Sequence, residues 1–308
     1  MPAPSPYSAR LERIPLERRE VEVLGGTTAY WVYGADDAET TVLAVHGFRG
    51  EHHGLEPVVA HLLSGAGYRS ASDVRVIMPD LPGFGETAPL PARVHDIDAY
   101  AEWLIAFAAA VAPGSVILGH SFGSIVASAA VAGGLPTPRL VLVNPIGAPA
   151  LEGPKSVLTR LAILYYALGA RLPESVGTEL LRNRLVVRIM SLAMVKTSDP
   201  VLRRFVHDQH DTYFSDFSDR KVLSEAFRAS VSHDVREYAP HIAVPTMLIA
   251  AQRDDITPIE AERALVPLFP DAELVEIAHV GHLIHYETPA EAAGAIRRFL
   301  RPLAVPTP

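Results

Sequence analysis

Short apolar runs separated by polar turns dominate the chain after its first twenty residues. Residues 21–23 and 27–33, joined by a turn at Gly25-Gly26, predict a pair of strands. Six later runs are rich in valine, isoleucine and leucine and lack alternation, which is typical of strands buried on both faces of a sheet. These runs lie at 41–45, 74–78, 116–118, 140–143, 247–250 and 274–277.

Helical patterns lie between most of these strands. They occupy residues 55–63, 97–111, 122–132, 259–268 and 289–300. Strands that alternate with helices form parallel sheets whose two faces are covered by the helices. The sequence therefore predicts an α/β fold: a mostly parallel, twisted sheet of about eight strands with helices on both faces and an inserted all-helical cap.

The interval 148–236 breaks this rhythm, because it contains helical patterns and no strand pattern. The patterns lie at 157–168, 178–194, 200–211 and 221–231, and Ser198-Asp199-Pro200 is a helix-start signal. We predict a core formed by residues 1–147 and 237–308, split by the insertion. Aromatic side chains such as Tyr165, Phe214 and Phe217 are expected in the insertion's own core, and they become candidate substrate contacts if the insertion covers the functional site.

Composition narrows the class of protein. Of 308 residues, 49% are hydrophobic and 20% are charged, which excludes global disorder. The net charge of −8 gives the chain no global basic footprint for nucleic acid or anionic lipid. The absence of cysteine excludes disulfides, thiolate nucleophiles and zinc fingers. No run resembles a signal peptide or a membrane span, so the expectation is a soluble, cytoplasmic protein, and nothing in the sequence indicates its oligomeric state.

The strongest local signal is the motif Gly-His-Ser-Phe-Gly at 119–123, between a predicted strand and a predicted helix. A turn this tight forces its serine into a strained backbone conformation and exposes the hydroxyl. Glycines are needed two residues to either side, because side chains there would collide with the strand and the helix. Ser121 is therefore the candidate nucleophile.

A serine nucleophile needs a base that is oriented by an acid. Three histidines, His279, His282 and His285, follow the last predicted strand, and His282 lies on a loop at the carboxyl edge of the sheet, where ligands bind. Two aspartates, Asp254 and Asp255, follow the preceding strand. Spacing alone leaves both aspartates open as the orienting acid.

An acyl-transfer intermediate also needs two N–H donors for its oxyanion. The amide of Phe122 is one candidate, and the amide of Phe48, in the loop after the strand 41–45, is the other. His46 is expected to hold that loop in shape. Arg49 is a candidate ligand for a substrate carboxylate, with a solvated or structural role as the default, and the pair His52-His53 is expected to be exposed.

Metal and cofactor motifs are weak in this chain. His207 and His210 have the i, i+3 spacing of helical metal ligands, but no third strong ligand is implied. The glycines at 83 and 85 are not followed by the helix-opening glycine of a dinucleotide-binding loop, and no phosphate loop is present. We expect neither a metal nor a cofactor.

The order of these motifs resembles the α/β-hydrolase fold family, in particular its members with a helical cap inserted after the sixth strand. The motifs are His-Gly-Phe at 46–48, Asp-Leu-Pro-Gly-Phe-Gly at 80–85, the serine motif, an aspartate before Pro258, and Gly281-His282. In the family a proline follows the acid four residues later, so the resemblance favours Asp254 over Asp255. Asp80 matches a position that is usually structural.

The resemblance and the residues together predict a serine hydrolase that cleaves carboxylic esters of a small molecule with an apolar portion. Carbon–carbon bond hydrolysis of a diketone-like substrate is an alternative, although Leu283 stands where such relatives often carry tryptophan. Thioester hydrolysis is another, because it uses the same triad. The alternative that is not an enzyme is a receptor that uses the hydrolase pocket to bind a ligand.

Overall fold

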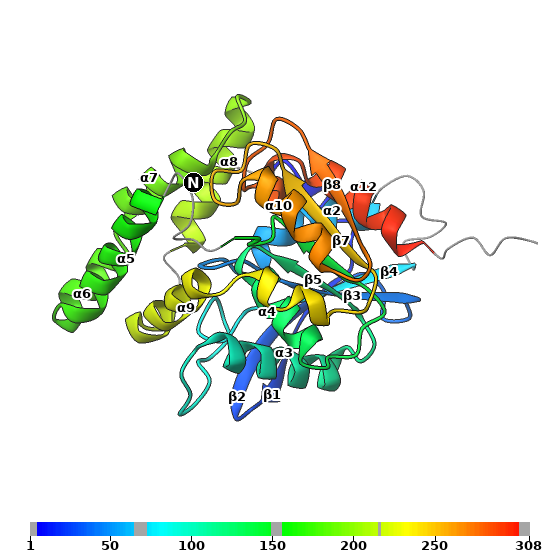
Figure 1. Cartoon of the computed structure of the whole chain (residues 1–308), viewed down its shortest axis with the longest axis horizontal. Helices are drawn as coiled ribbons and strands as arrows, with labels where there is room; N and C mark the ends of the chain where they lie inside the picture. Colours follow the sequence, from blue (N-terminus) through cyan, green and yellow to red (C-terminus); the bar gives the residue numbers. More distant parts are fainter. Residues whose placement is uncertain (1–4, 65–72, 149–155, 215–216, 302–308) are drawn as a thin grey trace, which may run out of the picture.

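Eight strands form a single sheet in the order β1-β2-β4-β3-β5-β6-β7-β8 (Figure 1). The computed structural model describes residues 5–64, 73–148, 156–214 and 217–301. Strands β1 and β2, and β2 and β4, pair antiparallel, while the remaining neighbours pair parallel. The predicted mostly parallel α/β class is confirmed. The strands are β1 (Leu16–Val23), β2 (Gly26–Tyr33), β3 (Thr40–Val45), β4 (Val74–Pro79), β5 (Val116–His120), β6 (Leu140–Val143), β7 (Thr246–Ala251) and β8 (Ala272–Ile277).

The first hairpin differs from its prediction in two respects. Strand β1 begins at Leu16, five residues early, because its first half is a charged, exposed edge that carries no apolar pattern. The turn residues are Leu24 and Gly25, with φ of 52° and 81°, rather than the two glycines. Positive φ at both central positions matches the twist of two-residue hairpins.

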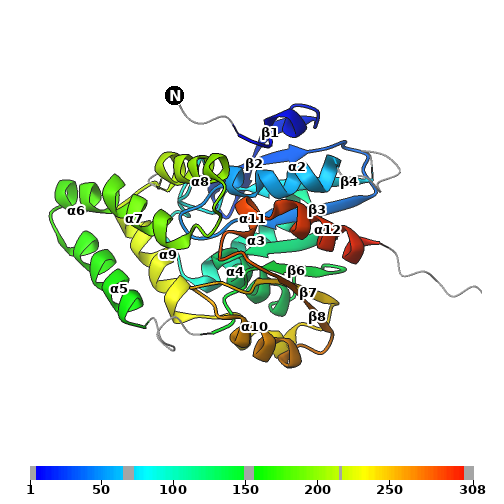
Figure 2. The same ribbon diagram turned by 90° about the horizontal axis from the view of Figure 1, so that it is seen from above.

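Helices cover both faces of the sheet (Figure 2). One apolar core contains side chains of α3 and α4, and a second contains side chains of α2 and α12. The core helices are α1 (Ser8–Leu11), α2 (Glu56–Ser64), α3 (Ile97–Val111), α4 (Phe122–Ala132), α10 (Ile259–Leu265), α11 (Ile284–Glu287) and α12 (Pro289–Leu300), with 3₁₀ turns at His52–Leu55, Val235–Glu237, Ala239–His241 and Val266–Leu268.

Within the described residues, five α-helices lie between β6 and β7. They are α5 (Ser156–Arg171), α6 (Glu174–Leu181), α7 (Arg184–Met194), α8 (Pro200–Tyr213) and α9 (Arg220–Ser232). The single helix predicted over 178–194 is wrong, because Asn183 interrupts it. The Asn183 side chain accepts the amide protons of Leu185 and Val186 and so begins a new helix, α7.

These five helices gather at one side of the molecule, away from α12 (Figures 1 and 2). An isolated bridge between Phe84 and Phe217 joins the insertion to the loop after β4, and the amide of Ser218 donates to the carbonyl of Gly83 at 3.0 Å. Among the helices in the described part of the chain, none is both long and apolar enough to span a membrane.

Two glycines predict opposite stability changes. A Cβ at Gly123 would overlap the carbonyl oxygens of Val45 and His46, whereas a Cβ at Gly294, inside α12, would meet only Arg298 at 3.8 Å. We expect Gly123→Ala to lower the free energy of unfolding by about 1–3 kcal/mol or more. Gly294→Ala should raise it by about 0.5–1 kcal/mol. Urea unfolding measures both, and equal effects would contradict the close β3–α4 packing.

Candidate active site

The turn between β5 and α4 holds Ser121 in a strained conformation. Its φ of 52° and ψ of −119° lie outside the regions that L-residues prefer. The Ser121 amide donates to the carbonyl of Val143 at 3.0 Å, which fixes the turn against β6. Cβ atoms at Gly119 or Gly123 would overlap neighbouring backbone. The glycines therefore let the strand and helix approach closely enough for this turn to form.

Ser121, His282 and Asp254 form a continuous hydrogen-bonded chain. The Nε2 of His282 lies 2.8 Å from the hydroxyl of Ser121, and its Nδ1 lies 2.7 Å from Oδ2 of Asp254. A carboxylate can only accept, so Nδ1 carries the proton and Nε2 is free to accept from the serine. Of the other two histidine candidates, His279 is exposed and His285 is buried beside His120.

The structure separates the two aspartates. Oδ1 of Asp254 accepts the amides of Ile256 and Thr257 at 2.7 and 3.2 Å, which holds the carboxylate in one orientation. Asp255 instead pairs with Lys196 of the insertion at 2.6 Å and remains 45% exposed. Its side chain thus lies outside the hydrogen-bonded chain.

Two buried polar groups near Asp254 are absent from the sequence prediction. Asn144, directly after β6, donates from Nδ2 to Oδ2 of Asp254 at 3.1 Å. Glu262 of α10 is fully buried beside Gly147, and burial, followed by the negative charge of Asp254, raises its pKa well above the usual value. The position of Asn144 at the carboxyl end of a strand was a usable signal, whereas Glu262 lies in an ordinary helical pattern.

The loop after β3 approaches Ser121 closely. A Cβ at Gly47 would lie 3.1 Å from the His120 ring and 3.2 Å from the Cβ of Ser121, so a larger residue would crowd this approach. His46 holds the loop as predicted: its Nδ1 donates to the carbonyl of Gly47 at 2.8 Å, and its Nε2 accepts the amide of Leu81 at 2.8 Å. Phe48 follows in this loop, and Phe122 is the first residue of α4.

Arg49, a candidate substrate ligand, bonds the insertion instead. Its guanidinium is buried, and its three nitrogens donate to the carbonyl of Phe214, the hydroxyl of Tyr166 and the carbonyl of Leu181 at 2.6, 3.1 and 2.8 Å. The three hydrogen bonds thus connect the loop after β3 to α5, α6 and the end of α8. This is the structural role that the sequence analysis held as the default.

Several aromatic side chains of the insertion have partners outside a shared apolar core. The hydroxyl of Tyr165 donates to the carbonyls of Leu180 and Leu181, and Phe217 is buried under the guanidinium of Arg182. A second group faces the loop after β3, because Phe48 contacts Tyr166 and Phe227 at ring-centroid distances of 5.7 and 5.8 Å. Tyr166 and Phe227, which the sequence analysis did not select as site residues, also stack on each other.

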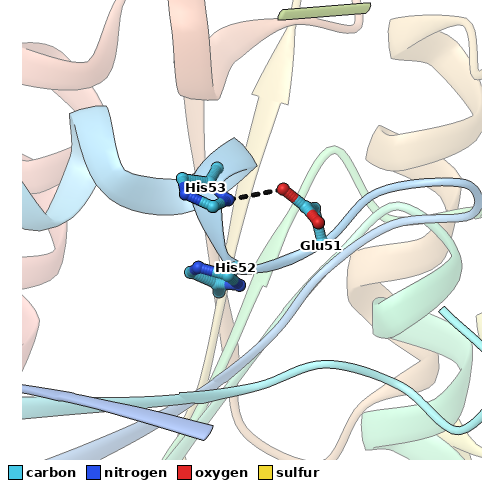
Figure 3. Close-up of side chains that lie close together, drawn as sticks. All are labelled: Glu51, His52 and His53. Carbon is cyan, nitrogen blue, oxygen red and sulfur yellow. Dashed lines mark hydrogen bonds and ion pairs between the residues drawn. The ribbon is translucent and has the colours of Figure 1, made fainter. Parts of the chain in front are cut away.

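Glu51, His52 and His53 form a compact cluster beyond the same loop (Figure 3). The predicted exposure of the histidine pair is wrong for His52, which is buried, donates from Nδ1 to Asp80 at 3.0 Å and stacks on Trp31. His53 pairs with Glu51 at 2.5 Å. These three residues offer metal-ligand atoms, but the present hydrogen bonds already engage Nδ1 of both histidines.

His207 and His210 point toward a serine rather than toward a shared metal position. The Nδ1 atoms of both rings lie within 2.7 Å of the hydroxyl of buried Ser191, which can donate to one ring and accept from the other. Asp211 is paired with Arg188 at 2.9 Å. The hydrogen bonds therefore link α7 to α8.

Two further buried histidines surround the turn at Ser121. Burial lowers the pKa of His120 to about 3 and lowers the pKa of His285 well below its usual value. Their rings lie 4.1 Å apart, and the ring of His120 lies 5.7 Å from that of His282. Both rings stay neutral at physiological pH, so neither places a positive charge beside His282.

The fold is that of a known protein family. Residues 42–295 match the model of the alpha/beta hydrolase family, which covers most of the chain. The protein belongs to this family.

The curated relatives of this chain include esterases and a deacetylase. The chain is 27% identical over 242 residues to a pimeloyl-[acyl-carrier protein] methyl ester esterase of Stenotrophomonas maltophilia, covering 77% of this chain and 86% of that one. A pyrrolizixenacetamide deacetylase of Xenorhabdus hominickii is 33% identical, but the match spans only 27% of this chain and 31% of the relative.

Solved structures share the fold at low sequence identity. A thermophilic esterase from Thermogutta terrifontis superposes with a TM-score of 0.70 at 22% identity, covering 92% of this chain and 98% of that one. An esterase from Exiguobacterium antarcticum gives a TM-score of 0.72 at 16% identity, covering 92% and 99%.

Because several histidines are buried, we expect the free energy of unfolding to fall at acid pH. His210 provides the test. Burial lowers the pKa of His210 from 6.5 to about 3. Between these values the unfolded chain binds one more proton than the folded chain, so stability is lost as the pH falls. His210→Gln should reduce the slope of unfolding free energy against pH by about 1.4 kcal/mol per unit between roughly pH 6 and 4.

Urea unfolding at stepped pH measures these slopes. The exposed His241 provides the matched control, and His241→Gln should leave the slope unchanged. Equal slopes for the wild type and His210→Gln would show that His210 does not hold a neutral, buried position.

Proposed function

We propose that this protein is a serine hydrolase that cleaves carboxylic esters through an acyl-enzyme on Ser121. The observation that carries the proposal is the hydrogen-bonded chain from Ser121 through His282 to Asp254, with distances of 2.8 and 2.7 Å. Membership of the hydrolase family and the esterase relatives support the same reaction class.

In the proposed mechanism the oxygen of Ser121 attacks the ester carbonyl while Nε2 of His282 takes the hydroxyl proton. Asp254 stabilises the resulting imidazolium through the Nδ1 proton. The amides of Phe48 and Phe122 donate to the oxyanion of the tetrahedral intermediate. As the intermediate collapses, His282 passes its proton to the leaving alcohol, and the acyl group remains on Ser121.

Deacylation repeats these steps with water as the nucleophile. His282 removes a proton from the water, and the hydroxide adds to the acyl carbonyl at the same oxyanion site. Collapse releases the carboxylic acid, and the proton on His282 returns to the oxygen of Ser121. Atoms balance over the cycle: one ester and one water give one acid and one alcohol.

The proposed substrate is a small molecule with an apolar acyl or alcohol portion, enclosed by residues 148–236 acting as a cap on the core of 1–147 and 237–308. The aromatic group of Phe48, Tyr166 and Phe227 supports this assignment, because it joins the loop that bears one oxyanion donor to α5 and α9 of the insertion. Of the aromatic residues selected from the sequence, Tyr165 contacts Tyr166 edge-on, Phe214 contacts the ring of His210, and Phe217 lies under the guanidinium of Arg49.

The central role of Ser121 is tested by substitution and labelling. Ser121→Ala should lose about 10⁴-fold or more in turnover of p-nitrophenyl esters, because no other group replaces the nucleophile. A fluorophosphonate should label the wild type at Ser121, located by peptide mass mapping, and should not label the variant. Labelling of another serine, or full activity in Ser121→Ala, would refute the assignment.

The two adjacent aspartates provide a matched pair. Asp254→Asn should lower turnover by about 10³–10⁴-fold, because an amide donating to Nδ1 favours the wrong imidazole tautomer. Asp255→Asn should change turnover little, since it removes only a partly exposed ion pair with Lys196. Steady-state kinetics on one ester ranks the variants, and the reverse order would exclude Asp254 as the orienting acid.

Acyl-chain preference tests the apolar wall. Each buried methylene contributes about 0.8 kcal/mol, so kcat/KM should rise with acyl length and then level off. Phe227→Ala removes a ring stacked against Tyr166 and should move the optimum to longer chains. Tyr165→Phe, which removes only hydrogen bonds to Leu180 and Leu181, serves as the control. If the wild type, Phe227→Ala and Tyr165→Phe all prefer the same acyl length, the acyl group does not bind against Phe227.

A further inference from the structure

The outer side of α7 and the start of α8 expose four large apolar side chains. Leu185, Ile189 and Leu192 are 68%, 57% and 51% exposed, and Val201 at the start of α8 is 63% exposed. At 100° per residue, the three α7 side chains fall within a stripe about 60° wide. The opposite side of the helix, marked by buried Val187, packs against the protein. Helix α7 therefore presents a second apolar face to the surroundings.

Basic side chains border this apolar stripe. Between residues 184 and 204 there are five lysines and arginines and a single acidic residue, Asp199, in a chain whose net charge is −8. Asp199 caps the start of α8 by accepting two backbone amides. Two aspartates, Asp208 and Asp211, follow later in α8, so residues 184–213 carry five basic and three acidic side chains, a small positive excess within an acidic chain.

Several of these groups converge on one surface pocket between α7 and α8. Three arginines, a histidine and one acidic residue are among its lining residues, which are Arg188, Ser198, Pro200, Arg203, Arg204, His207 and Asp208. Arg188 also pairs with Asp211. Burial is the main cause that lowers the pKa of His207, with smaller contributions from Arg188 and Arg203 that Asp211 and Asp208 oppose.

A stripe of leucine and isoleucine beside arginines is the composition of a helix that lies in a membrane interface. The apolar side chains enter the boundary of the acyl chains, while arginines bind lipid phosphates. A second copy of this face fits less well, because a twofold contact would bring two sets of like charges together. We propose that the α7–α8 face, formed by Leu185, Ile189, Leu192 and Val201 with Arg188, Arg203 and Arg204, binds peripherally to an anionic phospholipid bilayer.

This inference does not depend on the chemistry of Ser121. The full chain and its Ser121→Ala variant should cosediment equally with vesicles of 70% phosphatidylcholine and 30% phosphatidylglycerol. Both should bind pure phosphatidylcholine vesicles far more weakly, and raised salt should weaken binding to the anionic vesicles. The Ser121→Ala arm also prevents hydrolysis of the lipid from obscuring the result.

Substitutions separate the apolar and charged contributions. Ile189→Glu should weaken binding by at least about tenfold, because it places a charge in the stripe. Arg203→Gln/Arg204→Gln should weaken binding by roughly 25-fold, at about fivefold for each cation near the surface. The controls are Leu16→Glu and Arg13→Gln/Arg298→Gln, which change exposed residues outside the helical insertion. They should bind as the wild type does.

Circular dichroism and turnover of a short-chain ester verify that each variant is folded. Failure of the wild type to bind the anionic vesicles would overturn the proposal. So would equal loss of binding in the core controls. Sedimentation velocity tests whether a second copy of the chain binds this face instead. A wild-type dimer that Ile189→Glu dissociates, in a protein that does not bind vesicles, would identify the face as a subunit interface.

Discussion

The close approach of β5 to α4 determines where the other groups of the candidate site must lie. Glycines at 119 and 123 allow the backbone to turn with Ser121 at φ of 52°, and the hydroxyl then faces the carboxyl edge of the sheet. In parallel sheets the ends of neighbouring strands meet at this edge. The loops after β3, β7 and β8 therefore bring His46, Asp254 and His282 to one place although they are far apart in the sequence.

Hydrogen bonds around Asp254 make this arrangement rigid. Four groups donate to its carboxylate: two backbone amides, Asn144 and His282. A carboxylate with this many donors has one favoured orientation, which fixes the imidazole plane. Arg49 acts similarly at the other side of the site, because one guanidinium connects the loop after β3 to three segments of the insertion.

The sequence predicts the parts of this fold that depend on local patterns. Apolar runs and turn residues locate all eight strands, and the motif at 119–123 locates the serine. The first half of β1 (Leu16–Val23) is charged, so no apolar run marks it as a strand. Asn183 caps α7 and so ends the preceding helix, and the spacing of apolar residues does not show such a cap.

The remaining errors and omissions concern contacts between distant segments. Burial of His52 depends on Asp80 and Trp31, and the position of Glu262 beside Asp254 depends on how α10 packs. The choice between Asp254 and Asp255 needed a family resemblance, because adjacent residues share the same local pattern. Likewise, the net charge of −8 describes the whole chain and does not show that basic side chains gather on α7 and α8.

Direct observation of the covalent intermediate is the most direct test of the proposed ester hydrolysis. The wild type is mixed with p-nitrophenyl butyrate, quenched in acid within the first turnovers and analysed by intact-protein mass spectrometry. The proposal predicts a butyryl adduct, mapped to the peptide containing Ser121, whose amount matches the burst of p-nitrophenol. A burst accompanied by an adduct on another residue, or steady turnover with no adduct in both the wild type and Ser121→Ala, would contradict it.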